Sequence, residues 1–460
     1  MNRFIAMSKE LLADMETPVS AFMKLCKTQE TAYLFESSET VEKIGRYSII
    51  AWGPLGGLKL FHDRVEVSDA GGIRVCRPDE FFDASRSLLA DMSCAGVPDL
   101  PFVGSLVGYV GYDTVRLIER LPEAFLGDRP LSDLRLLSSF VIFDHYKRMM
   151  TLVAISGSTT DCTAMIRDME DRLRANSYKG NSRRTFSYDY PSRDIFMDSV
   201  EKAKRHILDG DIFQVVLSGQ FRGKGNLDPF DVYRWMRVRN PSPYMFYCSN
   251  GDRTLVGASP ETLVKIDGGS LFIRPIAGTR GRSKDPEVDR YLERELMGSE
   301  KEKAEHIMLV DLARNDAGRV CKYGTVKVDP YMTVERFSHV MHIVSEVTGT
   351  PHDELDSWEV FKAAFPAGTV SGAPKVRAME IISSLEESPR GPYGGAVGFW
   401  GAGQKMDTCI AIRMIEFCGD EFTLQAGAGI VADSIPEMEY EEILKKAAHG
   451  VAALKAAAGE

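Results

Sequence analysis

Residues 254–278 read "TLVGASPETLVKIDGGSLFIRPIAG", and residues 407–431 read "DTCIAIRMIEFCGDEFTLQAGAGIV". Both stretches consist of short runs rich in Val, Ile, Phe and Thr that are separated by Gly-containing turns, which is typical of antiparallel strands joined in meanders. Helical patterns stand between such stretches rather than after every strand. The sequence therefore predicts an α+β architecture and not the regular alternation of strand and helix in a doubly wound fold.

The organisation of the chain predicts two regions. The polar stretch "RANSYKGNSRRTFSYDYPSRD", residues 174–194, is typical of a connection. We therefore expect an N-terminal region over residues 1–180 and a second region over residues 190–460. Helical patterns predict helices at 161–174, 195–209, 228–239, 287–317, 357–365 and 436–457.

The composition excludes several classes of protein. The chain has 460 residues, 44% of them hydrophobic, and a net charge of −10 with Lys and Arg scattered along it. This argues against nucleic acid or an anionic membrane surface as the main partner. No run of about 18 apolar residues occurs, and the first 18 residues make a poor signal peptide. The eight cysteines contain no CxxC pair, so we expect reduced thiols in a cytoplasmic protein, with neither a zinc site nor a disulfide framework.

Two glutamates enter a run that is expected to be buried. In "EKAEHIMLVDLARND", Glu302 and Glu305 fall on one stripe of a helix, at about 100° per residue. The stripe continues through Leu309 and Leu312. A carboxylate turned inward is costly unless a positive group meets it. The sequence therefore predicts a cation at this place.

A second helix offers a similar pair. In "ADSIPEMEYEEILKKAAHG", Ser434 and Glu437 predict a capping box at the start of the helix. Glu439 and Glu442 follow and share a stripe with Lys446. Carboxylates at these spacings suit Mg²⁺, which keeps positions for water and substrate oxygens. The alternative is that both pairs are solvated glutamates in first helical turns, stabilised by the helix dipole.

A series of motifs resembles one family across nearly the whole chain. In order, they are "DMETPVSAF", "LFESSE" with "GRYS", "GYVGYD", "DIFQVVLS", "NPSPYM", "GASPETLV", "PIAGTRGR", "HIMLVDLARND", "HVMHIVSEVTG", "FPAGTVSGAPKVRAMEII", "YGGAVGF", "AIR" and "AGAGIVADSIPEMEYEE". Together they resemble the chorismate-utilising enzymes, and within them most closely the anthranilate synthase component I family. The resemblance implies large antiparallel sheets that form a sandwich flanked by helices.

The resemblance also implies a reaction and a metal. The family converts chorismate, a ring with two carboxylates, with Mg²⁺ held by glutamates that match Glu302, Glu305, Glu439 and Glu442. The metal would act as a Lewis acid for loss of the ring 4-hydroxyl. Glu261 in "GASPET" matches the general acid, which needs a raised pKa to hold its proton. Without the motif, Glu261 is an ordinary turn residue.

Further positions match the family's substrate-binding residues. Arg413 lies in the expected strand "AIRMI", where a buried guanidinium demands an anion, either the substrate or an internal carboxylate. Tyr393, the backbone N–H groups of Gly427 and Gly429, and Lys446 match the rest of this group. Glycine at the two strand positions lets the backbone approach a ligand closely.

Two positions discriminate among the chorismate enzymes. Isochorismate and salicylate synthases activate water with a lysine, where this chain has Gln214 in "DIFQVVLS". Aminodeoxychorismate synthases carry an attacking lysine, where this chain has Ala277 in "PIAGT". The resemblance places Gly278 and Thr279 beside it in the substrate site. Ammonia is therefore the expected nucleophile, and anthranilate and pyruvate are the expected products, with aminodeoxychorismate synthase component I as the alternative.

Two residues are implied in handling ammonia and the final elimination. Thr369 in "AGTVSG" matches a residue on the path of the nucleophile. His342 matches the histidine that assists loss of pyruvate, with His339 as the structural alternative. The chain lacks the G-x-C-x-G motif of a glutamine amidotransferase. We therefore expect ammonia from a separate glutaminase subunit, anthranilate synthase component II, in a hetero-oligomer.

The resemblance implies feedback inhibition by tryptophan as well. The matching positions are Glu36, Ser37, Pro243, Tyr244, Met245 and Cys409. Cys409 precedes Arg413 by four residues, and we expect both on one face of a strand. A Pro-rich turn entering a strand is the structural alternative for "NPSPYM". One departure is Gly219, which stands where the family pattern leads us to expect Arg or Gln.

The alternative outside the enzymes is a non-catalytic metal-binding or regulatory protein. It would use the same glutamates, but it would leave Glu261, His342 and Arg413 without a common function.

Overall fold

The computed structural model describes residues 4–37, 45–91, 94–96, 100–122, 127–175, 184–337 and 340–460. It combines helices with mostly antiparallel strands, which confirms the predicted α+β class. The helices are α1 Pro18–Leu25, α2 Phe81–Asp91, α3 Thr159–Arg174, α4 Arg193–Leu208, α5 Pro229–Arg239, α6 Pro286–Gly298, α7 Glu300–Gly318, α8 Ser357–Ala364, α9 Lys375–Leu385 and α10 Pro436–Ala458, with 3₁₀ turns η1 Pro78–Glu80, η2 Tyr112–Leu117 and η3 Gly368–Val370.

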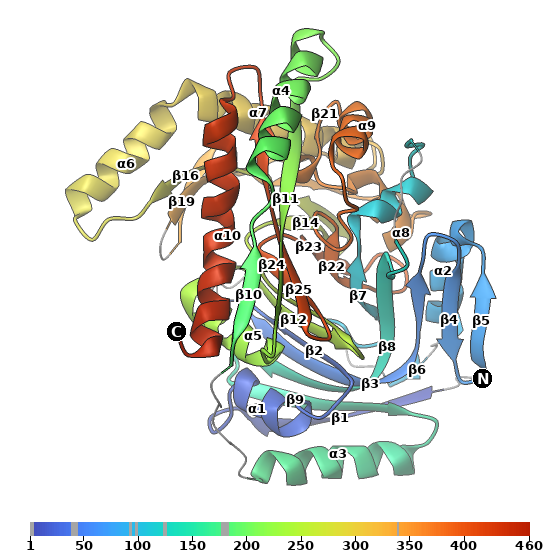
Figure 1. Cartoon of the computed structure of the whole chain (residues 1–460). Helices are drawn as coiled ribbons and strands as arrows, with labels where there is room; N and C mark the ends of the chain where they lie inside the picture. Colours follow the sequence, from blue (N-terminus) through green and yellow to red (C-terminus); the bar gives the residue numbers. More distant parts are fainter. Residues whose placement is uncertain are drawn as a thin grey trace.

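Long strands form the body of the molecule (Figure 1). The strands are β1 Phe4–Leu12, β2 Thr31–Glu36, β3 Tyr47–Leu60, β4 Val65–Asp69, β5 Gly72–Cys76, β6 Cys94–Ala95, β7 Leu106–Val110, β8 Ser132–Asp144, β9 Met149–Ser156, β10 Phe186–Asp189, β11 Gln214–Gly225, β12 Tyr244–Asn250, β13 Arg253–Ser259, β14 Thr262–Asp267, β15 Ser270–Ile273, β16 Ile276–Gly281, β17 Lys327–Val328, β18 Thr333–Arg336, β19 Val340–Val344, β20 Val347–Gly349, β21 Gly372–Ala373, β22 Ala396–Trp400, β23 Met406–Ile410, β24 Met414–Cys418 and β25 Glu421–Ile430.

The sheet divides into two arms that start from the long pair β3–β8. From β3, the first arm continues through β2, β12, β13, β24, β25 and β11. From β8, the second arm continues through β7, β22, β23, β14 and β15. Strands from both predicted regions pair directly, for example β2 with β12 and β7 with β22. The division into residues 1–180 and 190–460 stays a prediction.

Two large clusters of buried hydrophobic side chains fill the space between the layers. One surrounds the stacked rings of Trp358 and Trp400, whose centroids are 5.3 Å apart. The other lies beneath α1, α5 and α10 and contains the stacked rings of Phe22 and Phe230. Helix α10 runs along β25, and small residues on its buried face allow the close approach, since a Cβ at Gly450 would lie 2.1 Å from Leu424.

A smaller unit stands beside this body. Strands β16, β19 and β18 form a separate three-stranded sheet, and α6 packs on it and projects outward in Figure 1. Its own buried cluster consists of Leu296, Met341 and Ile343. We call α6 with β16, β18 and β19 the satellite unit.

Three sequence expectations need correction. The helix expected at 287–317 is two helices, because Ser299 ends α6 and caps α7 through the N–H of Glu302. Ser434 and Glu437 form no capping box: Ile435 is the N-cap of α10, and the Ser434 hydroxyl accepts a hydrogen bond from the N–H of Val431. Helices α1, α2 and α9 were not expected.

The remaining features concern the connection and the surface. Part of the polar stretch 174–194 forms β10, and residues 176–183 lie outside the described residues.

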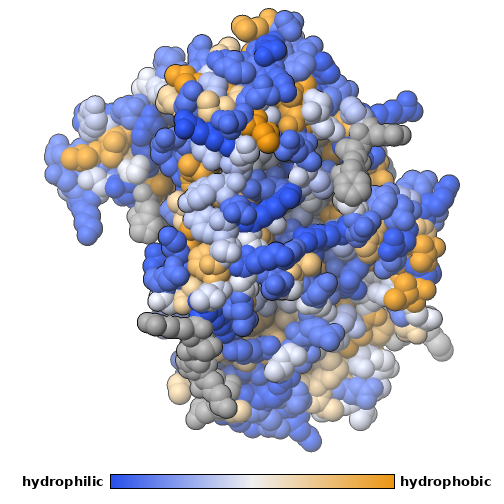
Figure 2. Space-filling view, in the orientation of Figure 1, coloured by the Kyte–Doolittle hydropathy of each residue, from blue (hydrophilic) through white to orange (hydrophobic). Residues whose placement is uncertain are grey.

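The face seen in Figure 2 is mostly hydrophilic, with hydrophobic residues in small separate patches. None of the described helices combines the length and the apolar character needed to cross a membrane. The cysteines whose side chains are described are all free thiols.

Candidate active site

Two short segments of the chain pass from one arm of the sheet to the other, and each carries a predicted site residue. Glu261 lies between β13, in the first arm, and β14, in the second. Arg413 lies between β23, in the second arm, and β24, in the first. The two crossing segments are bonded to each other, with Ile410 N donating to Glu261 O at 3.0 Å and Ala258 N to Arg413 O at 3.1 Å.

The backbone at Arg413 corrects the expectation of a mid-strand arginine. Arg413 has a φ of +49°, a left-handed conformation that L residues seldom adopt, and this ends one strand before the next begins. Cys409 and Arg413 are therefore not on one face of a continuous strand. The strain is local to the place where the chain changes arms, which is typical of functional sites.

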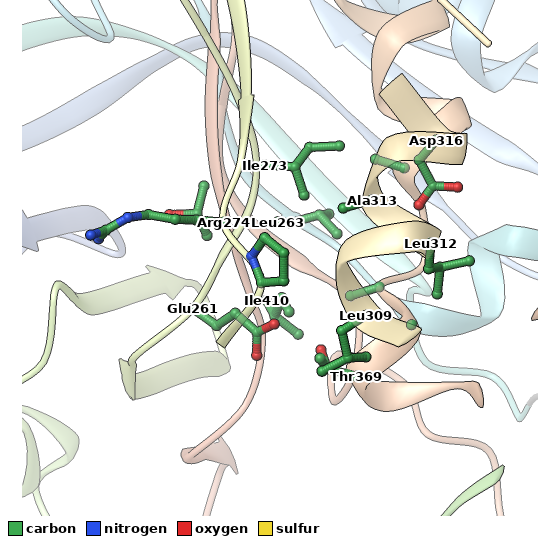
Figure 3. Close-up of a pocket in the computed structure, with 15 residues that line it drawn as sticks. Glu261, Leu263, Ile273, Arg274, Leu309, Leu312, Ala313, Asp316, Thr369 and Ile410 are labelled. Carbon is green, nitrogen blue, oxygen red and sulfur yellow. The ribbon is translucent and has the colours of Figure 1, made fainter. Parts of the chain in front are cut away.

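Glu261 is a buried acid. Burial raises its pKa to about 8, while the nearby Thr369 hydroxyl and the charges of Arg413 and Lys446 act in the opposite direction. Figure 3 shows the Glu261 carboxyl group directed toward Thr369. Although these two groups are close, the Thr369 hydroxyl is buried without a well-aligned hydrogen-bond partner among the described residues. Glu261 is thus mostly protonated at neutral pH.

A narrow cavity of about 40 Å³ reaches Glu261 and Thr369. Leu309 and Leu312 of α7 line it, together with Ile410 (Figure 3). Its walls are largely apolar, which explains the high cost of a charged carboxylate at Glu261. The predicted stripe on α7 therefore does face the interior.

Arg413 is a cation without an internal partner. Burial lowers the pKa of its guanidinium, and the neighbouring Glu261 carboxyl group raises it. Across the part of the chain that the structure describes, no carboxylate makes an ion pair with it. A partly buried guanidinium of this kind is suited to bind an anion.

His342, on β19 of the satellite unit, is held by the neighbouring strand β16. Its Nδ1 lies 2.8 Å from the carbonyl oxygen of Gly278 and 3.1 Å from the Thr279 hydroxyl. A carbonyl oxygen only accepts, so Nδ1 carries the proton and Nε2 is left as a base. Burial lowers the pKa of His342, and the positive charge of Arg413 adds to this. Ala277 precedes Gly278 and is buried opposite Ile343.

The end of β25 is built for close approach. A Cβ at Gly427 would lie 2.6 Å from the Tyr393 hydroxyl, and one at Gly429 would lie 2.6 Å from the Gln214 amide nitrogen. Lys446 of α10 donates to the Gly427 carbonyl oxygen at 2.9 Å. Since hydrogen-bonded and non-bonded pairs alternate in an antiparallel ladder, the Gly427 and Gly429 N–H groups point away from β11. The Gln214 amide oxygen is buried without a partner among the described residues.

Of the four predicted glutamates on α7 and α10, Glu302, Glu305 and Glu439 are partly buried and Glu442 is exposed. Burial raises the pKa of Glu305, with repulsion from Glu302 as the next cause and a smaller one from Glu442. Burial likewise raises the pKa of Glu439, and Glu442 adds to it. Arg280 donates to Glu302 at 3.1 Å. Glu305 and Glu439, whose charged forms are disfavoured, are oxygen donors of the kind that a hard divalent cation binds.

The spacing of these carboxylates and the lysines beside them limit the fit to a metal ion. Among the described residues, no three His, Cys, Asp or Glu side chains already lie close enough to hold a metal ion. Lys446 bridges to Glu442 at 2.7 Å, and Lys301 acts on both Glu305 and Glu439. Arg280 and the two lysines therefore supply part of the positive charge that neutralises these carboxylates.

The positions matched to a tryptophan site extend from β2 to the segment next to Glu261. Glu36 is buried and bonded to Tyr233 and Arg237, and Met245 pairs with it across β2 and β12. The Tyr244 hydroxyl lies 3.0 Å from Thr262, the residue after Glu261. The other members of this group are Ser37, which is also engaged, Pro243, which is buried, and Cys409, which pairs with Thr262.

Two features were not found from the sequence, and a third, the departure at Gly219, gains a structural reason. Arg280, which bonds Glu302, stands in a plain basic run "TRGR". Arg390 is completely enclosed, although "SPRGPYGG" has the composition of an exposed loop. Gly219 is explained by packing, because a Cβ there would lie 2.9 Å from both Ile443 and Pro191. His339, the alternative to His342, lies outside the described residues.

Comparison with known proteins gives the family. Residues 30–451 match the chorismate binding enzyme family. The chain is 42% identical to the anthranilate synthase component 1 of Thermus thermophilus, over 97% of both chains, and 40% identical to that of Acetivibrio thermocellus, over 96% of this chain and 94% of the other. The crystal structure of anthranilate synthase component I from Streptococcus pneumoniae has a TM-score of 0.78 and 34% identity, covering 97% of this chain and 99% of that one. The chain belongs to the chorismate binding enzyme family.

Proposed function

We propose that this protein converts chorismate and ammonia to anthranilate, pyruvate and water, which opens tryptophan biosynthesis. The observation that carries the proposal is the protonated Glu261, buried beside the unpaired guanidinium of Arg413. A neutral acid next to an anion-binding cation is the combination that removes a hydroxyl group from a carboxylate-bearing ring. The relatives named above support the choice of product.

Glu261 serves as the general acid. Hydroxide is a poor leaving group, so the Glu261 proton passes to the ring 4-oxygen as the C–O bond breaks and water leaves. Arg413 and the N–H groups of Gly427 and Gly429 bind a substrate carboxylate and orient the ring. The apolar walls at Leu309 and Ile410 exclude water, which would otherwise compete with ammonia.

His342 serves as the base in the second half of the reaction. After ammonia has added to the ring, a proton must leave the ring carbon while the enolpyruvyl group departs as pyruvate. Nε2 of His342 is unprotonated because Nδ1–H is donated to Gly278. Burial and Arg413 keep the imidazole neutral before the step.

Mg²⁺ is the proposed cofactor, held by Glu302, Glu305, Glu439 and Glu442. When bound, it supplies positive charge to the substrate carboxylate as a Lewis acid. The raised pKa values of Glu305 and Glu439 support this assignment, because a bound cation would offset the cost of burying their charge and the smaller repulsion between carboxylates. Mg²⁺ should raise the melting temperature of the native chain, and the Glu305→Gln, Glu439→Gln double variant should lose that response.

Ammonia is proposed to come from a glutamine amidotransferase subunit in a cytoplasmic hetero-oligomer. Gln214 and Ala277 support ammonia as nucleophile, since neither can activate water or attack the ring itself. The partly enclosed cavity at Thr369 admits a molecule of that size, because one water needs about 10–15 Å³ of such volume. Free thiols suit a reducing compartment.

Tryptophan is proposed as a feedback inhibitor at the group around Glu36 and Tyr244. Contact from Tyr244 to Thr262 offers a path to Glu261, the adjacent residue. Replacing Ser37 with Phe should abolish inhibition and leave turnover nearly unchanged. Unaltered inhibition in that variant would place the effector site elsewhere.

The deciding experiment uses the purified chain without a partner. With chorismate, Mg²⁺ and ammonium near pH 8, where about half of Glu261 keeps its proton and some free ammonia is present, we expect anthranilate fluorescence together with an equal amount of pyruvate. An amino product without pyruvate would indicate aminodeoxychorismate synthesis instead. Unchanged chorismate would refute the proposal altogether.

A further inference from the structure

Arg390 is a buried arginine that none of the proposed reaction steps uses. Its side chain follows α9 and is only 3% exposed. Glu386, four residues earlier at the end of α9, accepts from Nε at 2.8 Å and from Nη2 at 2.7 Å. Two aromatic rings enclose the guanidinium, with Tyr112 at 4.5 Å and Tyr393 at 5.8 Å from ring centroid to Cζ.

The remaining donors of Arg390 bind two backbone segments. Nη1 donates to the Val370 carbonyl oxygen at 2.6 Å, and Nη2 donates to the Val216 carbonyl oxygen at 2.7 Å. Val370 is the residue after Thr369, in η3, and Val216 lies in β11. One planar group therefore fixes the distance between a short turn and a central strand.

The turn needs such support. η3 spans only Gly368–Val370, and its N-cap Ala367 provides no side-chain hydrogen bond. Besides Arg390, the residues that follow the turn hold it to β11 through the bond from Val216 N to Ser371 O, at 2.8 Å, and through the pairing of β21 with β11, and the Ser371 hydroxyl donates to Ala367 O at 2.8 Å. Among these contacts, Arg390 alone binds the Val370 carbonyl oxygen inside η3. The Thr369 hydroxyl faces Glu261 from the turn, so any shift of the turn changes that approach.

We propose that Arg390 is a positioning residue that holds the turn carrying Thr369 against β11, and thereby keeps the Thr369 hydroxyl opposite the Glu261 carboxyl group. The proposal rests on the proposed function, because its effect is measured in anthranilate formation. A shift of about 1 Å in a reacting group is expected to cost roughly 100-fold in rate.

Arg253 provides a matched control. It is also buried, at 8% exposed, is paired with a glutamate, Glu416, and lies over a tyrosine ring, Tyr109, at 5.4 Å. It lies at the start of β13, whereas Glu261 follows the end of that strand. Arg→Lys at either place loses the planar fork and costs a similar amount of buried bonding.

The experiment is a double-mutant cycle with Thr369→Val, Arg390→Lys and Arg253→Lys, measured as kcat with chorismate, Mg²⁺ and ammonium. Arg390→Lys should lower kcat about 10- to 100-fold, on the scale expected for a misplaced group. Adding Thr369→Val to it should cost no more than about threefold beyond the worse single variant. Arg253→Lys should leave kcat within about twofold and combine multiplicatively with Thr369→Val.

The possible outcomes distinguish a failure of the proposed function from a failure of the positioning role of Arg390. Wild-type enzyme without anthranilate formation would refute the proposed function. An active wild type with multiplicative effects of Arg390→Lys and Thr369→Val, or with unchanged kcat in Arg390→Lys, would refute the positioning role alone. If Arg390→Lys does not fold, Glu386→Gln replaces it, and we expect the same non-additivity with a smaller loss.

Discussion

The two sides of the active site rest on very different supports. Glu261 and Arg413 lie at the crossing of the two sheet arms, between the two large buried clusters. His342 lies in the satellite unit, whose buried cluster contains only Leu296, Met341 and Ile343. The difference teaches that the acid keeps its proton because it is deeply buried in the large body, whereas the base is fixed as one tautomer by a backbone carbonyl and is kept neutral by its own burial and by Arg413.

The largest effect is expected on the crossing side. Glu261→Gln keeps the shape but removes the acidic proton, and we expect kcat to fall about 10²- to 10⁴-fold. The melting temperature should not fall, because Glu261 is already neutral in the folded protein. Glu287→Gln, at an exposed position on α6, is the control. A loss smaller than tenfold would remove Glu261 from the role of acid.

The next effect concerns the satellite side. His342→Gln retains an N–H donor toward Gly278 but lacks a basic nitrogen. We expect chorismate consumption to continue while pyruvate release slows about 100-fold. The two rates are measured in parallel by coupled assays, with exposed His352→Gln as the control. If both rates fell equally, His342 would act before ammonia addition.

A pair of methionines compares the two supports directly. Met341 in the satellite unit and Met406 in the large body are both fully buried. Truncation to Ala costs about 2–5 kcal/mol at such sites. Met341→Ala should open the satellite unit locally and lower kcat about tenfold with little change in global melting temperature.

Met406→Ala should do the reverse, lowering the melting temperature while the folded enzyme keeps its kcat within about twofold. Hydrogen exchange of β19 and β13 would follow the two units separately. Equal loss of global stability in both variants, without a difference in kcat, would mean that the satellite unit is not independent.

The smallest effect is the response to pH. Burial raises the pKa of Glu261 to about 8, and the acid form is the active one, so kcat/KM is expected to be full below pH 7 and lost as the pH rises through about 8. At pH 8 about half of the value at low pH should remain, at constant free ammonia. A profile that rises through pH 8 under those conditions would assign the opposite role to Glu261.

The sequence allowed the α+β class and most helices of the second region to be predicted, because their patterns are long and periodic. Prediction from the helical period failed where a single serine near the start of a helix determined the local structure. Ser299 divides the expected helix at 287–317 into α6 and α7, since a serine hydroxyl caps a new first turn. The Ser434 hydroxyl binds the Val431 N–H and the Glu439 carboxyl group instead of forming a capping box with Glu437.

Site residues were accessible to sequence reasoning only through the family resemblance. Nothing in "SPET" signals that Glu261 is enclosed, because burial arises from α7 and η3, which are distant in sequence. Arg413 could not be recognised as the end of a strand, since its left-handed backbone is set by the crossing and not by its own preference. The burial of Arg390 could not be predicted either, because its partners come from four separate segments of the chain.

The crossing of the two arms has a consequence for how this chain tolerates change. Residues 411–413 connect a strand whose register is set by β14 and β22 to one whose register is set by β13 and β25. A one-residue insertion or deletion there cannot be absorbed by a surface loop. It would turn every following side chain of β24 to the opposite side of its sheet, so this segment accepts exchanges of residue type far more readily than any alteration in length.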